Sequence, residues 1–254
     1  MLREFVCRGA LLRWREYGSG PPMVLVHGLS GSGLWWSRNL PALSAHYRVY
    51  VLELSGYGSA CRRPSLGVQA SAGLICAWLQ AQHISGAVLV GHSMGGQIAT
   101  LVASRCPERL RALVLASSTG LLKASLGWEM LQLPRALITG RADFVPTIAF
   151  DALRAGPCNL LYSARSLLGH STRDLLPNIS VPTLVVWGGR DALVPPALGR
   201  ALARAVPGAQ YTEFPHAGHV VMVDAAGPFN CAVLNFLCQL PQVTPQPGPA
   251  GPSS

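Results

Sequence analysis

The chain has 254 residues, of which half are hydrophobic and 12% are charged, and its formal net charge is +9. This length permits one large α/β domain or two small ones, with a hydrophobic core large enough to be stable without disulfides or structural metal ions. The basic residues are almost all arginine and are scattered apart from the pair Arg62-Arg63, so we expect no nucleic-acid partner. We expect one domain with an insertion and an unusually apolar surface.

The N-terminal residues carry charges that the apolar core of a signal peptide would not contain. Arg3, Glu4 and Arg8 interrupt this part of the sequence, so we expect a cytoplasmic protein. Residues 4–17 are predicted to form two short strands with a turn at Gly9.

Short apolar runs rich in valine and leucine follow along the chain. Such runs are typical of strands buried on both faces of a parallel sheet. The segments between them are long enough for crossover helices, which indicates repeated βαβ units. The runs are residues 23–26, 49–52, 87–90, 113–115 and 183–187, and a further strand is expected at 210–214.

A stretch without charged side chains extends from Pro64 to Ser104. Glutamine and histidine interrupt it too often for a transmembrane span, so we expect no integral membrane segment. One interpretation is a buried strand with flanking helices. The other is that a helix near residues 67–80 contacts a lipid-like surface or another subunit, as in a homo-oligomer.

Residues 120–178 interrupt the βαβ pattern and are predicted to form three or four short helices. Such an insertion would lie over the carboxyl edge of the sheet, where open α/β sheets bind ligands. We therefore expect a core of residues 1–119 and 179–240 with a helical cap of residues 120–178. The last core helix has apolar residues at helical spacing from Phe229 to Leu240. Residues 241–254 are expected to be a disordered, proline-rich tail.

The segment Gly91-His92-Ser93-Met94-Gly95-Gly96 indicates a candidate nucleophile, Ser93. A serine at GxSxG spacing, entered from a strand and followed by a helix, fits a sharp turn that exposes its hydroxyl. Gly91 and Gly95 lack the β-carbons that would crowd such a turn. The alternative is an ordinary glycine-rich turn, because short motifs also match by chance.

A serine nucleophile requires a base, and His219 is the candidate. It follows the expected strand 210–214 in a loop before the last helix, and Gly218 allows that loop to turn the ring inward. His216 is the rival and is expected to be an ordinary loop residue.

The acid that orients the base should lie between Ser93 and His219 in the sequence. Asp191 directly follows the buried strand 183–187 and is the candidate, although it could instead cap a helix before Pro195. The other aspartates of this interval are Asp143, Asp151 and Asp174, which fall in the expected cap and are predicted to face solvent.

The oxyanion of the reaction needs fixed hydrogen-bond donors, for which backbone amides are suited. The N–H of Met94 is one candidate, and the N–H of Leu29, after the expected strand 23–26, is the other. Trp35 and Trp36 are candidate substrate-binding residues, with packing inside their own helix as the alternative.

The seven cysteines form no CxxC pair, and an odd number cannot all pair within one chain. We expect free, buried thiols.

With these motifs in place, the sequence resembles the α/β-hydrolase family from about residue 4 to residue 240. The resemblance implies a mostly parallel eight-stranded sheet with helices on both faces and a helical cap, and it supports the same triad and oxyanion assignments. Ser93 stands where dehalogenases and epoxide hydrolases of the family use aspartate. His92 and Val220 differ from the asparagine and bulky aromatic residue typical of carbon–carbon hydrolases. The matching segments are Val26-His27-Gly28-Leu29, Gly56-Tyr57-Gly58-Ser59, residues 91–96, Gly188-Gly189-Arg190-Asp191 and Ala217-Gly218-His219.

We therefore expect a serine hydrolase that cleaves small, hydrophobic carboxylic esters through an acyl-Ser93 intermediate, without metal or cofactor. The same triad could instead serve lactone hydrolysis, carbon–carbon bond hydrolysis or acyl transfer. A non-catalytic, ligand-binding protein on this fold is a third alternative, because fold does not fix function.

Overall fold

The computed structural model describes residues 1–121 and 140–241 and contains one eight-stranded sheet in this part of the chain. The strand order is β1-β2-β4-β3-β5-β6-β7-β8, and only the pairs β1/β2 and β2/β4 are antiparallel. Every strand predicted from the sequence is present. The strands are β1 (Leu2–Cys7), β2 (Ala10–Tyr17), β3 (Pro22–Val26), β4 (Arg48–Glu53), β5 (Ala87–His92), β6 (Leu110–Ala116), β7 (Thr183–Gly188) and β8 (Gln210–Phe214).

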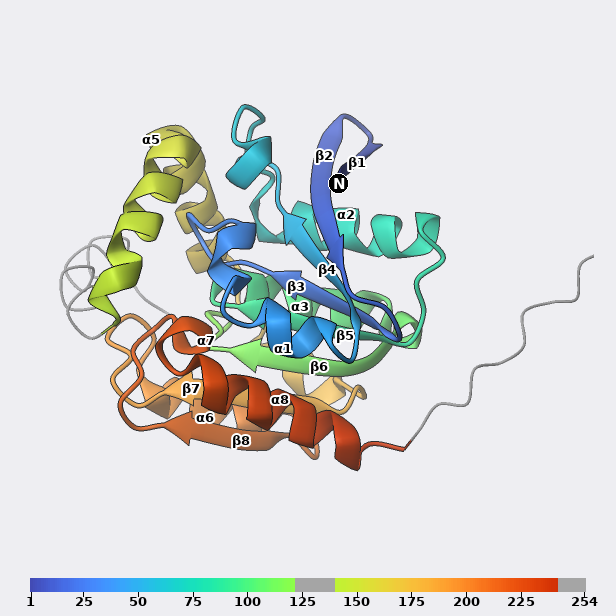
Figure 1. Cartoon of the computed structure of the whole chain (residues 1–254), viewed down its shortest axis with the longest axis vertical. Coiled ribbons are helices and arrows are strands. Elements are labelled where there is room, and N and C mark those ends of the chain that lie inside the picture. The colour runs from blue at the N-terminus through green and yellow to red at the C-terminus, as the bar shows by residue number, and fades with distance from the viewer. Residues whose placement is uncertain (122–139, 242–254) are drawn as a thin grey trace, which may run out of the picture.

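Helices cover both faces of this sheet (Figure 1). The α-helices are α1 (Leu40–Ser44), α2 (Gly67–Ala81), α3 (Met94–Arg105), α5 (Val145–Gly169), α6 (Pro196–Ala205), α7 (Val221–Asp224) and α8 (Ala226–Gln239). Short 3₁₀ helices are η1 (Gly33–Trp36), η2 (Gly58–Ala60), η3 (Pro107–Arg109), η4 (Ala142–Phe144) and η5 (Arg173–Asn178). Helices α2, α3 and α6 pack on one face, and α1, α7 and α8 on the other.

The central strands carry continuous apolar runs because both of their faces are buried. In β3, Val24 and Val26 join the core beneath α2 and α3, whereas Met23 and Leu25 join the core beneath α8. Side chains of a strand alternate between faces, so a strand buried on both sides shows a continuous apolar run instead of alternation. This explains why the runs could be recognised in the sequence.

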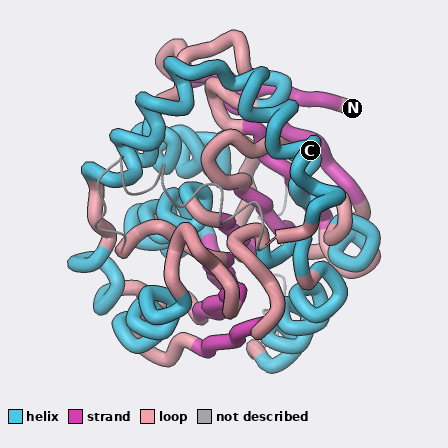
Figure 2. The backbone as a smooth tube through the Cα atoms, turned by 90° about the vertical axis from the view of Figure 1, so that its left-hand side faces the viewer, coloured by secondary structure: helices cyan, strands magenta, loops and turns pink. Residues whose placement is uncertain are grey.

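Strand β3 pairs with β4 on one side and β5 on the other, so the order of the strands changes direction at β3. Ligands of open α/β sheets bind beyond the carboxyl ends of the strands at such a point. Helix α5 lies on this side of the molecule, beyond the arrowheads of β6 and β8 (Figure 1). Seen from that side, helices surround the ends of the strands (Figure 2).

The described part of the expected cap is helical and consists of η4, α5 and η5. Helix α5 is broken at Gly156, where φ is +73° and Pro157 follows. Residues 122–139 of the expected cap and residues 242–254 of the expected tail lie outside the described residues. The boundaries of the cap remain a prediction.

The uncharged stretch forms α2, β5 and most of α3, and it is largely buried. Helix α2 places Val68, Ile75 and Trp78 in the core. Of the helices in the described ranges, none has the length and apolar character needed to cross a membrane. All seven cysteines are described and none forms a disulfide, but Cys158 and Cys231 are exposed, as is Cys238. The prediction of buried thiols therefore holds only for Cys106. It is wrong for the three exposed cysteines, and Cys7, Cys61 and Cys76 are only partly buried.

Replacement of Leu25 by alanine should destabilise the fold strongly. Leu25 is fully buried on β3 between β4 and β5, so the smaller side chain leaves a cavity at the centre of the sheet. We expect a loss of about 2–5 kcal/mol in the free energy of unfolding, measured by chemical denaturation. Val6→Ala on the edge strand β1, where Val6 is exposed, is the matched control and should change it by less than about 0.5 kcal/mol.

Candidate active site

Ser93 occupies a strained turn between β5 and α3, with φ of 53° and ψ of −117°. A β-carbon at Gly91 would lie 2.3 Å from the carbonyl oxygen of Gly95, and one at Gly95 would lie 2.4 Å from that of Val26. Only glycine can occupy these two positions without displacing backbone. The strained serine is held by close packing of α3 against β3, and such strain concentrates at functional sites.

The structure brings Ser93, His219 and Asp191 together at the carboxyl ends of β5, β8 and β7. The Nε2 atom of His219 lies 3.0 Å from Ser93 Oγ, and Nδ1 lies 2.9 Å from Asp191 Oδ2. The other oxygen of Asp191 accepts the N–H groups of Leu193 and Val194, at 3.0 and 2.8 Å. Asp191 thus also holds the turn before α6, but it does not cap that helix, whose N-cap residue is Pro195 without a side-chain cap hydrogen bond. All three triad side chains are buried.

His92 fixes the backbone of His219 from the neighbouring strand β5. Its Nε2–H donates to the carbonyl oxygen of His219 at 2.9 Å, and the two rings lie 5.0 Å apart. Burial, followed by the nearby His219, holds the pKa of His92 well below its usual value, so this ring stays neutral. His216, the rival base, is exposed and contacts Arg190 instead of Ser93.

The loop after β3 approaches Ser93 closely. A β-carbon at Gly28 would lie 3.0 Å from the β-carbon of Ser93, so the adjacent Leu29 is near the nucleophile. Among the described residues, no hydrogen-bond acceptor takes the N–H of Leu29. Met94 is the first residue of α3, where amide groups have no partner within the helix. The loop of Leu29 and the first turn of α3 thus both adjoin Ser93, and the oxyanion role of their two amides stays a prediction.

His27 holds this loop from within the core. Its Nδ1–H donates to the carbonyl oxygen of Gly28 at 2.8 Å, and Nε2 accepts the N–H of Leu54 at 3.2 Å. Burial lowers the pKa of His27, which favours this neutral tautomer. His27 thus shapes the loop that carries Leu29 through two hydrogen bonds to the backbone.

Trp35 and Trp36 are both buried in η1. Trp36 has no exposed surface and packs near Phe229 of α8, as the packing alternative predicts. Trp35 lies between His92 and Phe144, with ring centroids 5.6 and 5.7 Å away. It therefore joins the nucleophile turn to the cap, and substrate contact by either tryptophan stays a prediction.

The prediction that the cap aspartates face solvent is wrong for Asp151. Asp143 and Asp174 are exposed, but Asp151 on α5 is only 1% exposed. Its Oδ2 accepts the hydroxyl of Ser32 at 2.7 Å and the indole N–H of Trp35 at 3.0 Å. Its Oδ1 has no hydrogen-bond partner. The cap is thus attached to the loop after β3 through a buried carboxyl group, which no local pattern in the sequence indicates.

A second attachment joins the cap to the helix of the nucleophile. Gln97 on α3 donates to the carbonyl oxygens of Leu167, at 3.1 Å, and His170, and it accepts the hydroxyl of Thr119 at 3.1 Å. In the sequence, Gln97 is one of the polar residues that interrupt the uncharged stretch from Pro64 to Ser104. Its position four residues after Ser93, one helical turn along α3, was the available signal.

The comparisons with known proteins agree with this fold. The model of the alpha/beta hydrolase family matches residues 23–230, which is most of the chain. The protein belongs to the α/β-hydrolase family.

Relatives with assigned activities include transferases and esterases. The chain is 35% identical to the dihydrolipoyllysine-residue acetyltransferase component of the acetoin cleaving system of Pseudomonas putida, over 90% of this chain and 67% of that protein. It is 30% identical to a pimeloyl-[acyl-carrier protein] methyl ester esterase of Vibrio atlanticus, over 89% of this chain and 97% of the esterase. A thermophilic esterase from Thermogutta terrifontis has a similar fold, with a TM-score of 0.82, 24% identity and coverage of 94% and 98%.

The burial of Asp151 predicts a pH-dependent contribution to stability. Burial raises the pKa of Asp151 above its usual value, so the folded protein binds the proton more readily than the unfolded chain. Asp151 should therefore favour folding more as the pH falls from 7 towards about 4, the ordinary range of aspartate. Measured by denaturation, the free energy of unfolding of Asp151→Asn relative to wild type should decrease over this interval. Asp174→Asn in the same segment is the control, and a pH-independent difference for Asp151→Asn would contradict the prediction.

Proposed function

We propose that this protein is a serine hydrolase that cleaves carboxylic esters through an acyl-Ser93 intermediate. The observation that carries the proposal is the chain of two hydrogen-bond contacts from Asp191 through His219 to Ser93, at 2.9 and 3.0 Å. Each contact has the length and order that nucleophilic catalysis by serine requires.

In the acylation step, Ser93 Oγ attacks the carbonyl carbon of the ester while His219 Nε2 takes the hydroxyl proton. Asp191 accepts the Nδ1–H hydrogen bond, which fixes the tautomer and stabilises the imidazolium that forms. The carbonyl oxygen becomes an oxyanion and accepts hydrogen bonds from the N–H groups of Leu29 and Met94. Collapse of this intermediate breaks the ester C–O bond, and His219 gives its proton to the leaving alkoxide.

In the deacylation step, water attacks the acyl carbon and gives a proton to His219 Nε2. The same two amides stabilise the second oxyanion. Collapse then breaks the bond to Ser93 Oγ, which takes the proton back from His219, and the carboxylic acid leaves. The steps use only protein groups and water.

The substrate class is proposed from relatives and from the apolar setting of the site. The esterase of Vibrio atlanticus, which is similar over nearly its whole length, is named for a methyl ester. Trp35 lies between the ring of His92 and that of Phe144. An ester with a small alcohol part and an apolar acyl part would suit such surroundings.

Acyl transfer is the second candidate function, because the relative from Pseudomonas putida is named as an acetyltransferase component. The two functions share the acyl-enzyme and differ only in whether water or another nucleophile attacks it. Product analysis with p-nitrophenyl acetate in the presence of added alcohols or thiols separates them. A hydrolase should release mainly acetate, and dominant transfer products would favour the transferase.

Replacement of Ser93 or His219 by alanine should nearly abolish ester hydrolysis. Each change removes a reacting group of the triad, and we expect kcat on a p-nitrophenyl ester to fall by roughly 10⁴- to 10⁶-fold. The measurement is steady-state hydrolysis, with circular dichroism to verify folding.

His216→Ala is the matched control for His219→Ala, since it removes a nearby histidine that does not contact Ser93. Its kcat should remain close to that of wild type. A fluorophosphonate probe should label wild type at Ser93 and leave Ser93→Ala unlabelled. Turnover near the wild-type rate in Ser93→Ala would overturn the proposed function.

A further inference from the structure

The loop that carries His219 is fixed at three consecutive residues, each by a different part of the protein. The carbonyl oxygen of Ala217 accepts the N–H of Arg190 at 2.9 Å, and that of His219 accepts Nε2–H of His92 at 2.9 Å. Between them, the N–H of Gly218 donates to Oδ2 of Asp224 at 2.9 Å. The other two partner groups are a backbone N–H and an imidazole, whereas Asp224 contributes a carboxylate.

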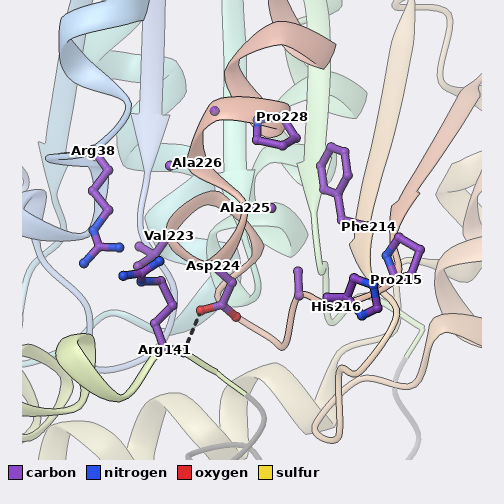
Figure 3. A pocket seen from close by; sticks show the side chains of 12 residues that line it. Arg38, Arg141, Phe214, Pro215, His216, Val223, Asp224, Ala225, Ala226 and Pro228 are labelled. Atoms are coloured by element: carbon purple, nitrogen blue, oxygen red, sulfur yellow. Dashed lines mark hydrogen bonds between the residues drawn. The ribbon is translucent and has the colours of Figure 1, made fainter.

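The second oxygen of Asp224 is also occupied. Its Oδ1 accepts the backbone N–H of Arg141 at 2.9 Å, at the start of the described cap segment that leads into η4. Figure 3 shows the Asp224 carboxylate turned toward Arg141, beside the loop of His216. One side chain at the end of α7 thus joins the cap to the residue directly before His219.

We propose that Asp224 is a positioning residue for His219. Because Asp224 also binds the backbone N–H of Arg141, the position of His219 depends on where residue 141 lies. The proposal rests on the proposed function, in which His219 is the base. Asp224 does not contact Ser93 in this arrangement and acts through the amide of Gly218.

The charge of Asp224 supports the same role. Burial raises the pKa of Asp224, whereas the amides of Arg141 and Gly218 and the charge of His219 act in the opposite direction. The attraction is mutual, so the carboxylate favours the protonated ring of His219. The other ionisable groups around these two residues are Asp191 and His92 beside His219, and Arg38, Asp143 and His216 near Asp224.

The neighbourhood provides a control for the loss of charge. Asp143 is exposed and accepts hydrogen bonds from the guanidinium groups of Arg38 and Arg141, both at 2.9 Å. It therefore touches Arg141 but makes no contact with the His219 loop. Asp143→Asn removes a carboxylate from the same part of the surface and leaves both hydrogen bonds of Asp224 in place.

The backbone of Arg141 permits a separate test of the link to the cap. Its φ is −72°, which proline can adopt, so Arg141→Pro removes the N–H that Asp224 accepts while preserving the backbone conformation. Arg141→Ala keeps this N–H and loses the same side-chain contacts. The ratio between the two variants measures the whole link between residue 141 and Asp224, because the proline ring also displaces the carboxylate from its place beside the backbone nitrogen.

The experiment measures two properties of the full chain. The first is the pH titration of the His219 ring by NMR, with the signal assigned through His219→Ala, and it does not depend on activity. The second is the pH dependence of Ser93 labelling by a fluorophosphonate. If wild type is not labelled, the proposed function fails, while the NMR titration still tests the role of Asp224.

Asp224→Asn should move the His219 titration and the acidic limb of labelling to lower pH by about 0.5–1 unit. It should also lower the plateau rate by about 10- to 100-fold, because the ring is less well placed. Arg141→Pro should be labelled several-fold more slowly than Arg141→Ala, and Asp143→Asn should match wild type. An unshifted titration in Asp224→Asn, or the same shift in Asp143→Asn, would overturn the proposal. If Asp224→Asn does not fold, the Arg141 pair decides, and equal rates in its two members would overturn it.

Discussion

The site depends on one close contact, the packing of the first turn of α3 onto the end of β3. A β-carbon at Gly95 would strike the carbonyl oxygens of Val26 and His27, so glycine allows the helix to approach the strand. This approach forces the positive φ of Ser93 and brings the loop of Leu29 beside it. The nucleophile and both amides proposed to bind the oxyanion are therefore arranged by backbone packing and need no flexible side chain, which is the preorganisation that electrostatic catalysis requires.

The surroundings of this turn are neutral and heavily hydrogen-bonded. His27 and His92 are buried imidazoles whose pKa values are lowered, and each holds a loop through a backbone carbonyl group. Buried neutral donors fix geometry without adding a charge that would compete with the ion pair formed during the reaction. The carboxylates of Asp191 and Asp224 are then the negative groups that act on His219, one directly and one through Gly218.

The sequence was sufficient to predict the sheet and the residues at the ends of its strands. Strands buried on both faces are recognisable as continuous apolar runs. Ser93 and Asp191 follow two such strands, β5 and β7, and His219 follows the neighbouring strand β8. Asp151, Gln97 and Asp224 could not be found in this way. Asp151 lies 119 residues from Ser32, Gln97 lies 70 residues from Leu167, and Asp224 lies 83 residues from Arg141. Their roles therefore depend on tertiary contacts. For the same reason Asp151 was expected on the surface, because a charged residue in a helical segment usually is exposed. Its burial is stabilised by two donors distant in sequence, the Ser32 hydroxyl and the Trp35 indole N–H.

The break at Gly156 divides α5 into two halves with separate attachments. The first half is held to the loop after β3 through Asp151, and the second is held to the segment before α2, where Ser163 accepts the hydroxyl of Tyr57 at 2.6 Å. Gly156 has no neighbouring atom against which a side chain would pack. The cap helix therefore consists of two segments that meet at a glycine with positive φ, a backbone conformation that residues with a β-carbon rarely adopt.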